Sequence, residues 1–227
     1  MDNYNYHKGM NGIIQELKCL LKTKSIGTDS DRALLLDFQA TLETKPEKAI
    51  KLEKDALAQI ETITVDNARL VSNLHANLGG LYRMNGHPDL AREHMEKSIS
   101  LLDQFNLLHI NDSIPQIANY AMFLTEQQEP ERGISELQKL SGIIKEYHSD
   151  DCLDYAKVQE TLGTIYLMTA NLPQAKTHFK RAFKIYEKIW ADEPEMIEAK
   201  YQEIQELYPQ IGFSIGKTLS GLLTRAI

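Results

Sequence analysis

The sequence predicts an all-α fold, a superhelical solenoid in which antiparallel helix hairpins stack one after another. Three observations predict it. Small or apolar residues recur at a step of 42 residues, the second half of each repeat carries one apolar helical face, and prolines mark the same place in successive repeats. Because these observations concern independent properties of the repeat, they define both the fold class and its helices.

The period comes from columns of residues that keep one step along the chain. Two columns keep it with little change in character, and a third stays small or apolar. The columns are Leu36, Leu78, Tyr120 and Leu162; Ala49, Ala91, Gly133 and Ala175; and Ala56, Ser98, Leu140 and Ala182. Small residues such as Gly79, Ala121 and Gly163 allow two helix backbones to approach closely, so each repeat is expected to be a packed helix pair.

The second helix of each pair is predicted from apolar or small residues spaced alternately by four and three. This spacing puts them on one face of an α-helix. The three faces are Ala91, Met95, Ser98, Leu102 and Phe105; Gly133, Leu137, Leu140, Ile144 and Tyr147; and Ala175, Phe179, Ala182, Tyr186 and Ile189. The turn before each second helix contains a proline, which suits the first turn of a helix. These prolines are Pro46, Pro88, Pro130 and Pro173.

The first repeat departs from the pattern. Asp37 stands where later repeats have a small residue, Ala40 replaces a tyrosine, and Glu53 replaces a large apolar side chain. We nevertheless expect a helix pair here, because the three columns begin in this repeat.

The ends of the chain are predicted to be caps, because a solenoid otherwise leaves an apolar face uncovered at each end. We expect a tail and capping helix over 1–29, a repeat array over 30–209 and a capping or partner helix over 210–227. A fifth half-repeat is expected near Pro194, before Pro209 and Gly212 break the helix. The terminal apolar stripes are Ile13, Leu17, Leu20 and Leu21, then Ile215, Leu219, Leu222, Leu223 and Ile227. The second stripe either covers the core or joins a partner or a second copy in a homodimer.

Composition narrows the class of partner. The 227 residues are 42% hydrophobic and carry a formal charge of -7, which suits a folded, soluble protein and disfavours direct binding of nucleic acid. No apolar stretch approaches the roughly 20 residues that span a bilayer, and no secretory signal is present, so a cytoplasmic location without membrane association is expected. Cys19 and Cys152 lack metal or disulfide spacing and are predicted to be buried small hydrophobic residues.

The sequence contains no recognised catalytic or phosphate-binding motif. The seven histidines show no metal-ligand spacing, and no metal or other cofactor is predicted. Gly216, Lys217 and Thr218 resemble the end of a phosphate loop, but Ile211 occupies the position of its first glycine. The sequence therefore predicts a protein that is not an enzyme.

Two segments carry a motif that resembles the tetratricopeptide repeat. They are Leu78, Gly79, Tyr82, Ala91 and Met95, and Leu162, Gly163, Tyr166, Ala175, Phe179 and Ala182. The resemblance covers residues 31–208, and the 42-residue step is similar to that of kinesin light chains and of bacterial peptide-sensing regulators of the Rap type.

The resemblance implies that the first helix of each hairpin lines a concave groove. In such proteins an asparagine before the leucine column often binds the backbone of a peptide, since its amide offers both a donor and an acceptor. Asn77 and Asn119 stand there in this chain, with Thr161 in the next repeat and Leu35 in the first. The alternative is that the two asparagines bond neighbouring helices or loops.

Further groove residues implied by the resemblance are a mixture of polar groups and adaptable methionines. They are Asn73, Arg83, Met84, Met122, Thr125, Glu126, Lys157, Glu160, Leu167 and Met168. The basic pair of a carboxylate clamp is missing, because Ala76 and Ala118 precede the asparagines. Recognition of a chaperone C-terminus is therefore not expected.

Three functions follow from these observations. The first is a module that binds a protein or peptide segment in the groove, as in a bacterial regulatory or sensing subunit. The second is a scaffold that self-associates through its terminal helices without a groove ligand. The third, an activity on phosphorylated response regulators, is disfavoured because the extra helical domain of Rap-type relatives is not evident. A DNA-binding helix-turn-helix is also not expected, because too few residues precede the array.

Overall fold

All regular secondary structure in the described part of the chain is helical. The structure is a computed structural model and describes residues 27–110 and 113–207, together with Gly12 and Gln15. Within 27–110 and 113–207 there are nine helices and no strand. They are α2 (Asp29–Thr41), α3 (Pro46–Leu57), α4 (Ala68–Met84), α5 (Pro88–Gln104), α6 (Ser113–Glu126), α7 (Pro130–Tyr147), α8 (Leu153–Met168), α9 (Leu172–Ile189) and α10 (Pro194–Leu207). The all-α prediction is confirmed.

The described helices run from α2 to α10. Helix α2 starts at Asp29, where the Thr28 side chain caps it, and α10 starts at Pro194 as predicted for a fifth half-repeat. Ile204 of α10 is buried. The predicted terminal caps, including the stripes from Ile13 and Ile215, lie outside the described residues, as does Cys19.

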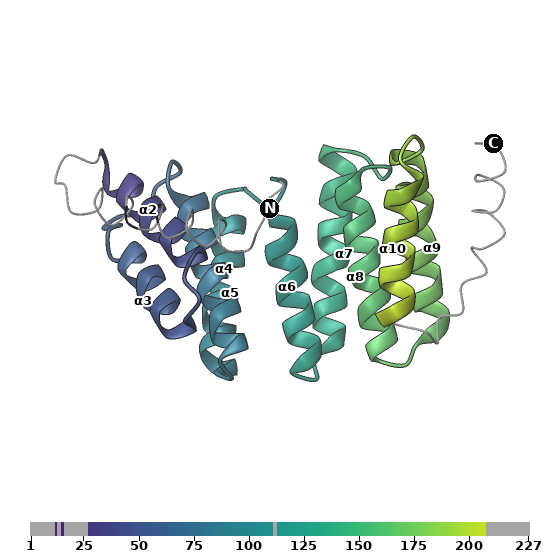
Figure 1. Cartoon of the computed structure of the whole chain (residues 1–227), viewed down its shortest axis with the longest axis horizontal. Coiled ribbons are helices and arrows are strands. Elements are labelled where there is room, and N and C mark those ends of the chain that lie inside the picture. The colour runs from purple at the N-terminus through teal and green to yellow at the C-terminus, as the bar shows by residue number, and fades with distance from the viewer. Residues whose placement is uncertain (1–11, 13–14, 16–26, 111–112, 208–227) are drawn as a thin grey trace. The chain divides into compact units, whose positions relative to one another are not determined.

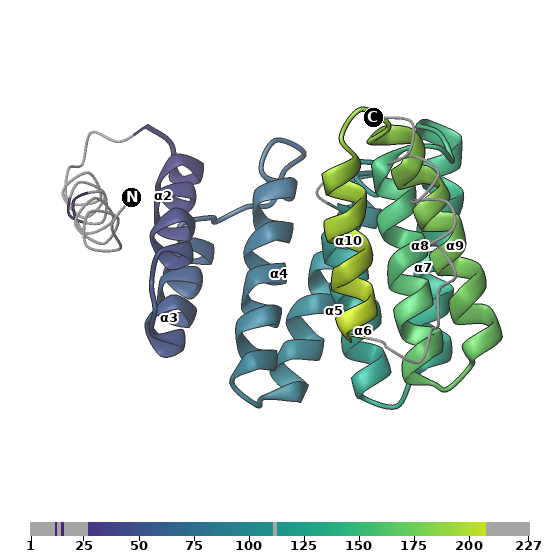
Figure 2. The ribbon, with the colours of Figure 1, turned by 45° about the vertical axis from the view of Figure 1, so that its right-hand side comes forward.

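The chain divides into two compact units, residues 1–119 and 120–227, with the boundary inside α6. In the first unit α2 packs on α3, α4 packs on α5, and α3 also contacts α4. In the second unit α8 packs on α9, while α7 contacts α8 and α10 contacts α9. Both ribbon views show the α2–α3, α4–α5 and α8–α9 pairs running side by side (Figures 1 and 2). The predicted helix hairpins are confirmed in each unit.

Glycines of the predicted columns lie where helices touch. A Cβ atom on Gly133 of α7 would lie 2.6 Å from the carbonyl oxygen of Ala121 in α6. On Gly163 of α8 it would lie 2.9 Å from the ring of Phe179 in α9. These distances leave no room for a methyl group, so the small residues set the spacing of the helices.

The turn inside each of the later hairpins has the same geometry. Gly86, Gln128 and Ala170 adopt left-handed backbone angles, with φ of 73°, 65° and 58°. The next residue's N–H donates back to a carbonyl near the helix end: His87 to Tyr82 (2.9 Å), Glu129 to Leu124 (2.8 Å) and Asn171 to Tyr166 (2.7 Å). This is the Schellman pattern, which satisfies carbonyls that the helix end leaves open. A proline is the first or second residue of the next helix, as predicted.

Two packing predictions are wrong in part. Cys152 is half-buried and precedes α8, where its sulfur accepts a hydrogen bond from the backbone N–H of Tyr155 at 3.4 Å. It caps the helix and does not fill the core. Tyr147 and Ile189 were expected on buried faces, yet they are 52% and 40% exposed. Both lie in the last turn of their helices, so the apolar stripe ends there at the solvent.

Candidate functional site

The first unit contains a cavity of about 570 Å³ between its first two hairpins. We call it the inner cavity. Its wall includes Glu53, Ala76, Asn77, Gly80, Met84 and Asn119. A smaller cavity of about 150 Å³ shares Ala76, Gly80, Met84 and Asn119 and is also lined by Arg83. The structure thus gathers Asn77, Arg83, Met84 and Asn119, four of the residues predicted for the groove.

Small side chains make up part of the inner wall. A Cβ atom added to Gly80 would meet nothing within 4 Å, and Ala76, one turn earlier on α4, contributes only a methyl group. Met84 is 74% exposed, and Asn119 is exposed. The wall therefore leaves open space beside Gly80, and it presents the adaptable apolar side chain of Met84 and the accessible amide of Asn119.

Asn77 bridges two carboxyl groups. Its Nδ2 donates to Asp37 Oδ1 at 2.8 Å and to Glu53 Oε1 at 3.2 Å. Glu53 is only 2% exposed, and its Oε2 is a buried atom without a hydrogen-bond partner. We call these three residues the acid cluster. The Asn77 amide donates to the protein itself, which is the internal contact that the sequence left as an alternative.

The acid cluster holds a proton at neutral pH. Burial, followed by repulsion from Asp37, raises the pKa of Glu53 from 4.5 to about 9. Burial also raises the pKa of Asp37, while its hydrogen bond with Glu53 lowers it. Glu53 is therefore the protonated partner and Asp37 the ionised one, so the pair carries one negative charge.

The acid cluster occupies a defined position of the repeat. Asp37 and Glu53 each lie one 42-residue period before Gly79 and Met95. In the second hairpin this position is a tight apolar contact, because a Cβ atom on Gly79 would lie 2.6 Å from Met95 Cγ. The first hairpin thus replaces a glycine packed on a methionine by two carboxyl groups.

Asn73 belongs to a different polar network in the first unit. Its Oδ1 accepts from Gln116 Nε2 at 2.5 Å, and Gln116 Oε1 accepts from the hydroxyls of Ser72 at 2.9 Å and Ser98 at 2.5 Å. These contacts connect α4, α5 and the start of α6. The side-chain oxygen of Asn73 is therefore engaged within the protein.

The second unit carries the other predicted groove residues. Thr161 donates to the backbone oxygen of Lys157 at 3.0 Å, and Lys157 Nζ lies 3.8 Å from Asp154. Thr125 likewise donates to its own helix. The remaining predicted residues are Met122, which is half-buried, Glu126 and Met168, which are exposed, and Leu167, which is buried.

Comparison with known families identifies the repeat. Residues 113–188 match the sequence model of the tetratricopeptide repeat. These residues carry tetratricopeptide repeats. No curated protein matches the sequence of the chain.

Solved structures of tetratricopeptide-type repeats have the same fold at low sequence identity. BtubC (BKLC) from P. vanneervenii aligns over 96% of this chain and 87% of its own, with 18% identity and a TM-score of 0.71. A putative kinesin light chain from P. anserina with nearly identical repeats aligns over 83% and 92%, with 13% identity and a TM-score of 0.68. MamA aligns over 83% and 96%, with 16% identity and a TM-score of 0.56. At such low sequence identity, the structural likeness shows a shared fold and nothing about function.

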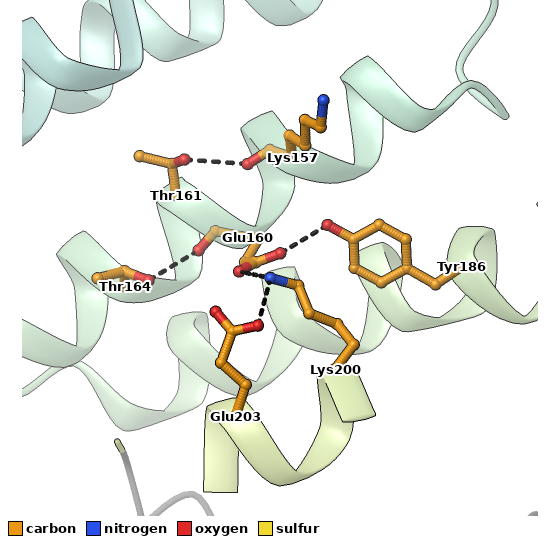
Figure 3. A network of polar contacts seen from close by, with 7 residues as sticks. All are labelled: Lys157, Glu160, Thr161, Thr164, Tyr186, Lys200 and Glu203. Carbon is orange, nitrogen blue, oxygen red and sulfur yellow. Dashed lines mark hydrogen bonds and ion pairs between the residues drawn. The ribbon is translucent and has the colours of Figure 1, made fainter. Parts of the chain in front are cut away.

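In the second unit, Glu160 anchors α10. Its carboxylate accepts from the Tyr186 hydroxyl at 2.6 Å and lies 2.9 Å from Lys200 Nζ (Figure 3). Lys200 also reaches Glu203 at 3.0 Å. Glu160 was predicted to face a groove, but its carboxylate bonds side chains of α9 and α10.

We expect Tyr186→Phe to lower the free energy of unfolding by about 1.5 kcal/mol, the loss of one hydrogen bond to a charged acceptor. Lys200 still neutralises Glu160, which limits the cost. Urea denaturation followed by circular dichroism measures the change. Tyr166→Phe is the control, because the Tyr166 ring stacks on His178 and the substitution keeps that ring. A loss equal to that of the control contradicts the prediction.

The described residues offer no grouped metal ligands. Among them, no three or more histidine, cysteine, aspartate or glutamate side chains are arranged to hold a metal ion. Across the described helices, none combines the length and the apolar composition needed to cross a bilayer.

Several residues that form the inner cavity and the acid cluster were not predicted as site residues from the sequence. Ala76 was considered only because it excludes a carboxylate clamp. Gly80 was not considered, because the repeat motif uses the preceding residue, Gly79. Asp37 and Glu53 were identified only as departures from the repeat pattern. The one feature of the sequence that links them is that both are acidic. Only the packing of α2 on α3 brings these two departures together.

Proposed function

We propose that this protein binds a peptide segment of a partner protein in the inner cavity. Tetratricopeptide repeat arrays are protein-interaction folds, and this supports an interaction module in general. The observation that carries the finer proposal is that Asn77, Met84 and Asn119 line the inner cavity beside α4, and that Arg83 lines the smaller cavity next to it.

The chemistry of the wall suits a peptide chain. Asn119 is exposed, and its amide offers a donor and an acceptor that can pair with a backbone peptide group of any sequence. Met84 is unbranched and polarizable, so it can adapt to different apolar side chains. Gly80 and Ala76 leave room for the chain to lie close to α4.

Filling the cavity tests the proposal without removing a contact. Gly80→Leu adds a side chain where nothing lies within 4 Å, and it replaces glycine by a better helix former, so the variant should fold. The probe is a library of N-acetylated, C-amidated random dodecapeptides, selected on wild type by affinity and identified by mass spectrometry. We expect Gly80→Leu to weaken binding of the selected peptides at least tenfold.

The matched control is Gly142→Leu on α7, because Gly142 also has nothing within 4 Å of its Cβ position and does not line either cavity. This variant should bind the selected peptides as wild type does. Equal binding by Gly80→Leu and wild type, or failure to select any peptide, would remove the inner cavity as the peptide site.

The alternative scaffold function depends on residues 210–227, which lie outside the described part of the chain. Homodimer formation through that segment stays a prediction from the sequence. The same holds for a role as a bacterial regulatory or sensing subunit and for the cytoplasmic location.

A further inference from the structure

Two half-buried histidines meet inside the second hairpin. The Nδ1 atoms of His75 in α4 and His94 in α5 lie 2.9 Å apart, while the ring centres lie 5.1 Å apart, so the two nitrogens face each other. A neutral imidazole carries a single N–H, so one of these nitrogens donates and the other accepts. The hydrogen bond therefore exists only while at least one Nδ1 is unprotonated.

The same position two 42-residue periods later holds its histidine with an amide. In both repeats a tyrosine ring stacks on the histidine of the second helix, 5.5 Å from His94 and 5.2 Å from His178 between ring centres. His178 Nδ1, however, lies 2.9 Å from Oε1 of Gln159, which takes the place of His75. An amide oxygen accepts at every pH, so His178 can keep this hydrogen bond when its ring becomes charged.

The charged surroundings of the His75–His94 pair are mostly basic. The charged groups that act on the two rings come from α3 and α5, and they are Lys54, Glu93 and Lys97. Residues 113–119, the part of α6 in the first unit, carry no charged side chain. Asp37 of α2 accepts from Asn77, as described above. A single acid therefore faces two lysines around the pair.

The closed hairpin opposes protonation of both rings. Burial, followed by repulsion from His94, lowers the pKa of His75 from 6.5 to about 4, and burial also lowers the pKa of His94. A first added proton can be held at Nε2 of the donor ring without breaking the hydrogen bond. A second puts an N–H on both Nδ1 atoms and two positive charges on facing rings.

We propose that the His75–His94 contact is an acid-sensitive joint, which holds α4 on α5 near neutral pH and opens when both rings are protonated. Between pH 6.5 and 4 an open hairpin holds a proton on His75 that the closed hairpin does not. The stability of the closed form is therefore full above pH 6.5 and is lost as pH falls toward 4.

Opening of this joint would also disturb the inner cavity. Helix α4 carries His75 directly before Ala76 and Asn77, which belong to the cavity wall together with Gly80. Acid is therefore expected to weaken the binding of a peptide there. This consequence rests on the proposed function, whereas the joint itself does not.

Hydrogen exchange of the full chain measures the opening of each hairpin. Protection factors, which remove the intrinsic effect of pH on exchange, are compared at pH 7 and 4.5 for amides of α4–α5 and of α8–α9. His75→Gln gives the second hairpin the pairing that Gln159 and His178 make, so this variant should fold. His87→Gln is the matched control, because it removes an exposed histidine of the same hairpin that makes no side-chain capping bond.

We expect the α4–α5 amides of wild type to lose at least tenfold more protection on acidification than the α8–α9 amides. Each pH unit between 6.5 and 4 can change the opening constant by up to about tenfold for one such group. His75→Gln should remove most of this excess, and His87→Gln should leave it unchanged within twofold.

Hairpins that open only together would lose protection equally, and the comparison then lies between the proteins. Protection throughout the chain should in that case decrease at least tenfold less in His75→Gln than in wild type. An acid-induced loss of the same size in His75→Gln and wild type overturns the joint in either case.

NMR of the histidine rings tests the pairing directly. Two-bond ¹⁵N–¹H spectra of wild type at pH 7.5 should show one ring of the pair protonated at Nδ1, and His75 should titrate well below its ordinary pKa of 6.5. If both rings carry their proton at Nε2 and titrate near 6.5, the joint is overturned.

Peptide binding is a separate outcome. Peptides selected from the library should bind wild type at least tenfold more weakly at pH 4.5 than at pH 7, and His75→Gln should reduce this loss. If no peptide is selected, the proposed function fails, and hydrogen exchange and NMR still decide the joint. Affinity that is equally pH-dependent in both proteins overturns control of the cavity by this contact.

Discussion

Glu53→Gln is expected to make the protein more stable, by about 3 kcal/mol at pH 7. Below pH 4.5 the Glu53 carboxyl is protonated in both the folded and the unfolded chain, so its contribution to stability is fully present. Between pH 4.5 and its folded pKa of about 9, the folded chain holds a proton that the unfolded chain has released. Each pH unit in that window lowers the free energy of unfolding by about 1.4 kcal/mol.

The glutamine side chain avoids this loss because it stays neutral and keeps almost the same shape. The gain from Glu53→Gln should therefore be close to zero at pH 4.5 and increase toward pH 9. Urea denaturation of both proteins at pH 5, 7 and 8.5 measures it, with Glu43→Gln as the control for loss of an acid from the same cavity. A gain independent of pH, or a less stable variant, contradicts the protonated Glu53.

Gly133→Ala is expected to destabilise the protein by about 2 kcal/mol. The added methyl carbon would lie 2.6 Å from the oxygen and 3.2 Å from the carbon of the Ala121 carbonyl. Both atoms belong to the backbone of α6, which cannot move away as a flexible side chain can. Overpacking typically costs about 1–3 kcal/mol, and backbone contacts place this case at the high end, above the roughly 1 kcal/mol that alanine gains in helix propensity.

The matched control is Gly142→Ala in the same helix α7. Its Cβ atom meets nothing within 4 Å, so only the helix propensity changes and the variant should gain up to about 1 kcal/mol. Thermal and urea unfolding of the two variants should therefore shift in opposite directions. Stabilisation of both would mean that α6 and α7 can separate at no cost.

The sequence predicts the repeat well because its signals are local and repeated. Gly133 and Gly163 identify close helix contacts, and Pro88 and Pro130 mark the turns that precede the second helices. Of the three left-handed turn residues, only Gly86 is of a residue type that favours these angles. Gln128 and Ala170 adopt the same angles because the hydrogen bonds of the repeated turn impose them, although their residue types do not favour them.

The contacts of individual polar side chains were harder to predict from the sequence. Asn77 and Asn119 occupy the same position of the repeat, yet Asn77 bonds two carboxyl groups and Asn119 lines the inner cavity, exposed. A periodic pattern states which helix face a residue occupies. It does not state which side chain from another helix lies within hydrogen-bonding distance.

The sequence by itself determined that the chain is a stack of helix pairs, because small residues every 42 positions fix where backbones can approach. Only the tertiary structure decided that Asp37 and Glu53 meet, that Asn77 bridges them, and that Glu53 lines the inner cavity. The physical reason is that protonation and charge depend on burial and on neighbours from other helices. Those neighbours are set by how α2, α3 and α4 pack.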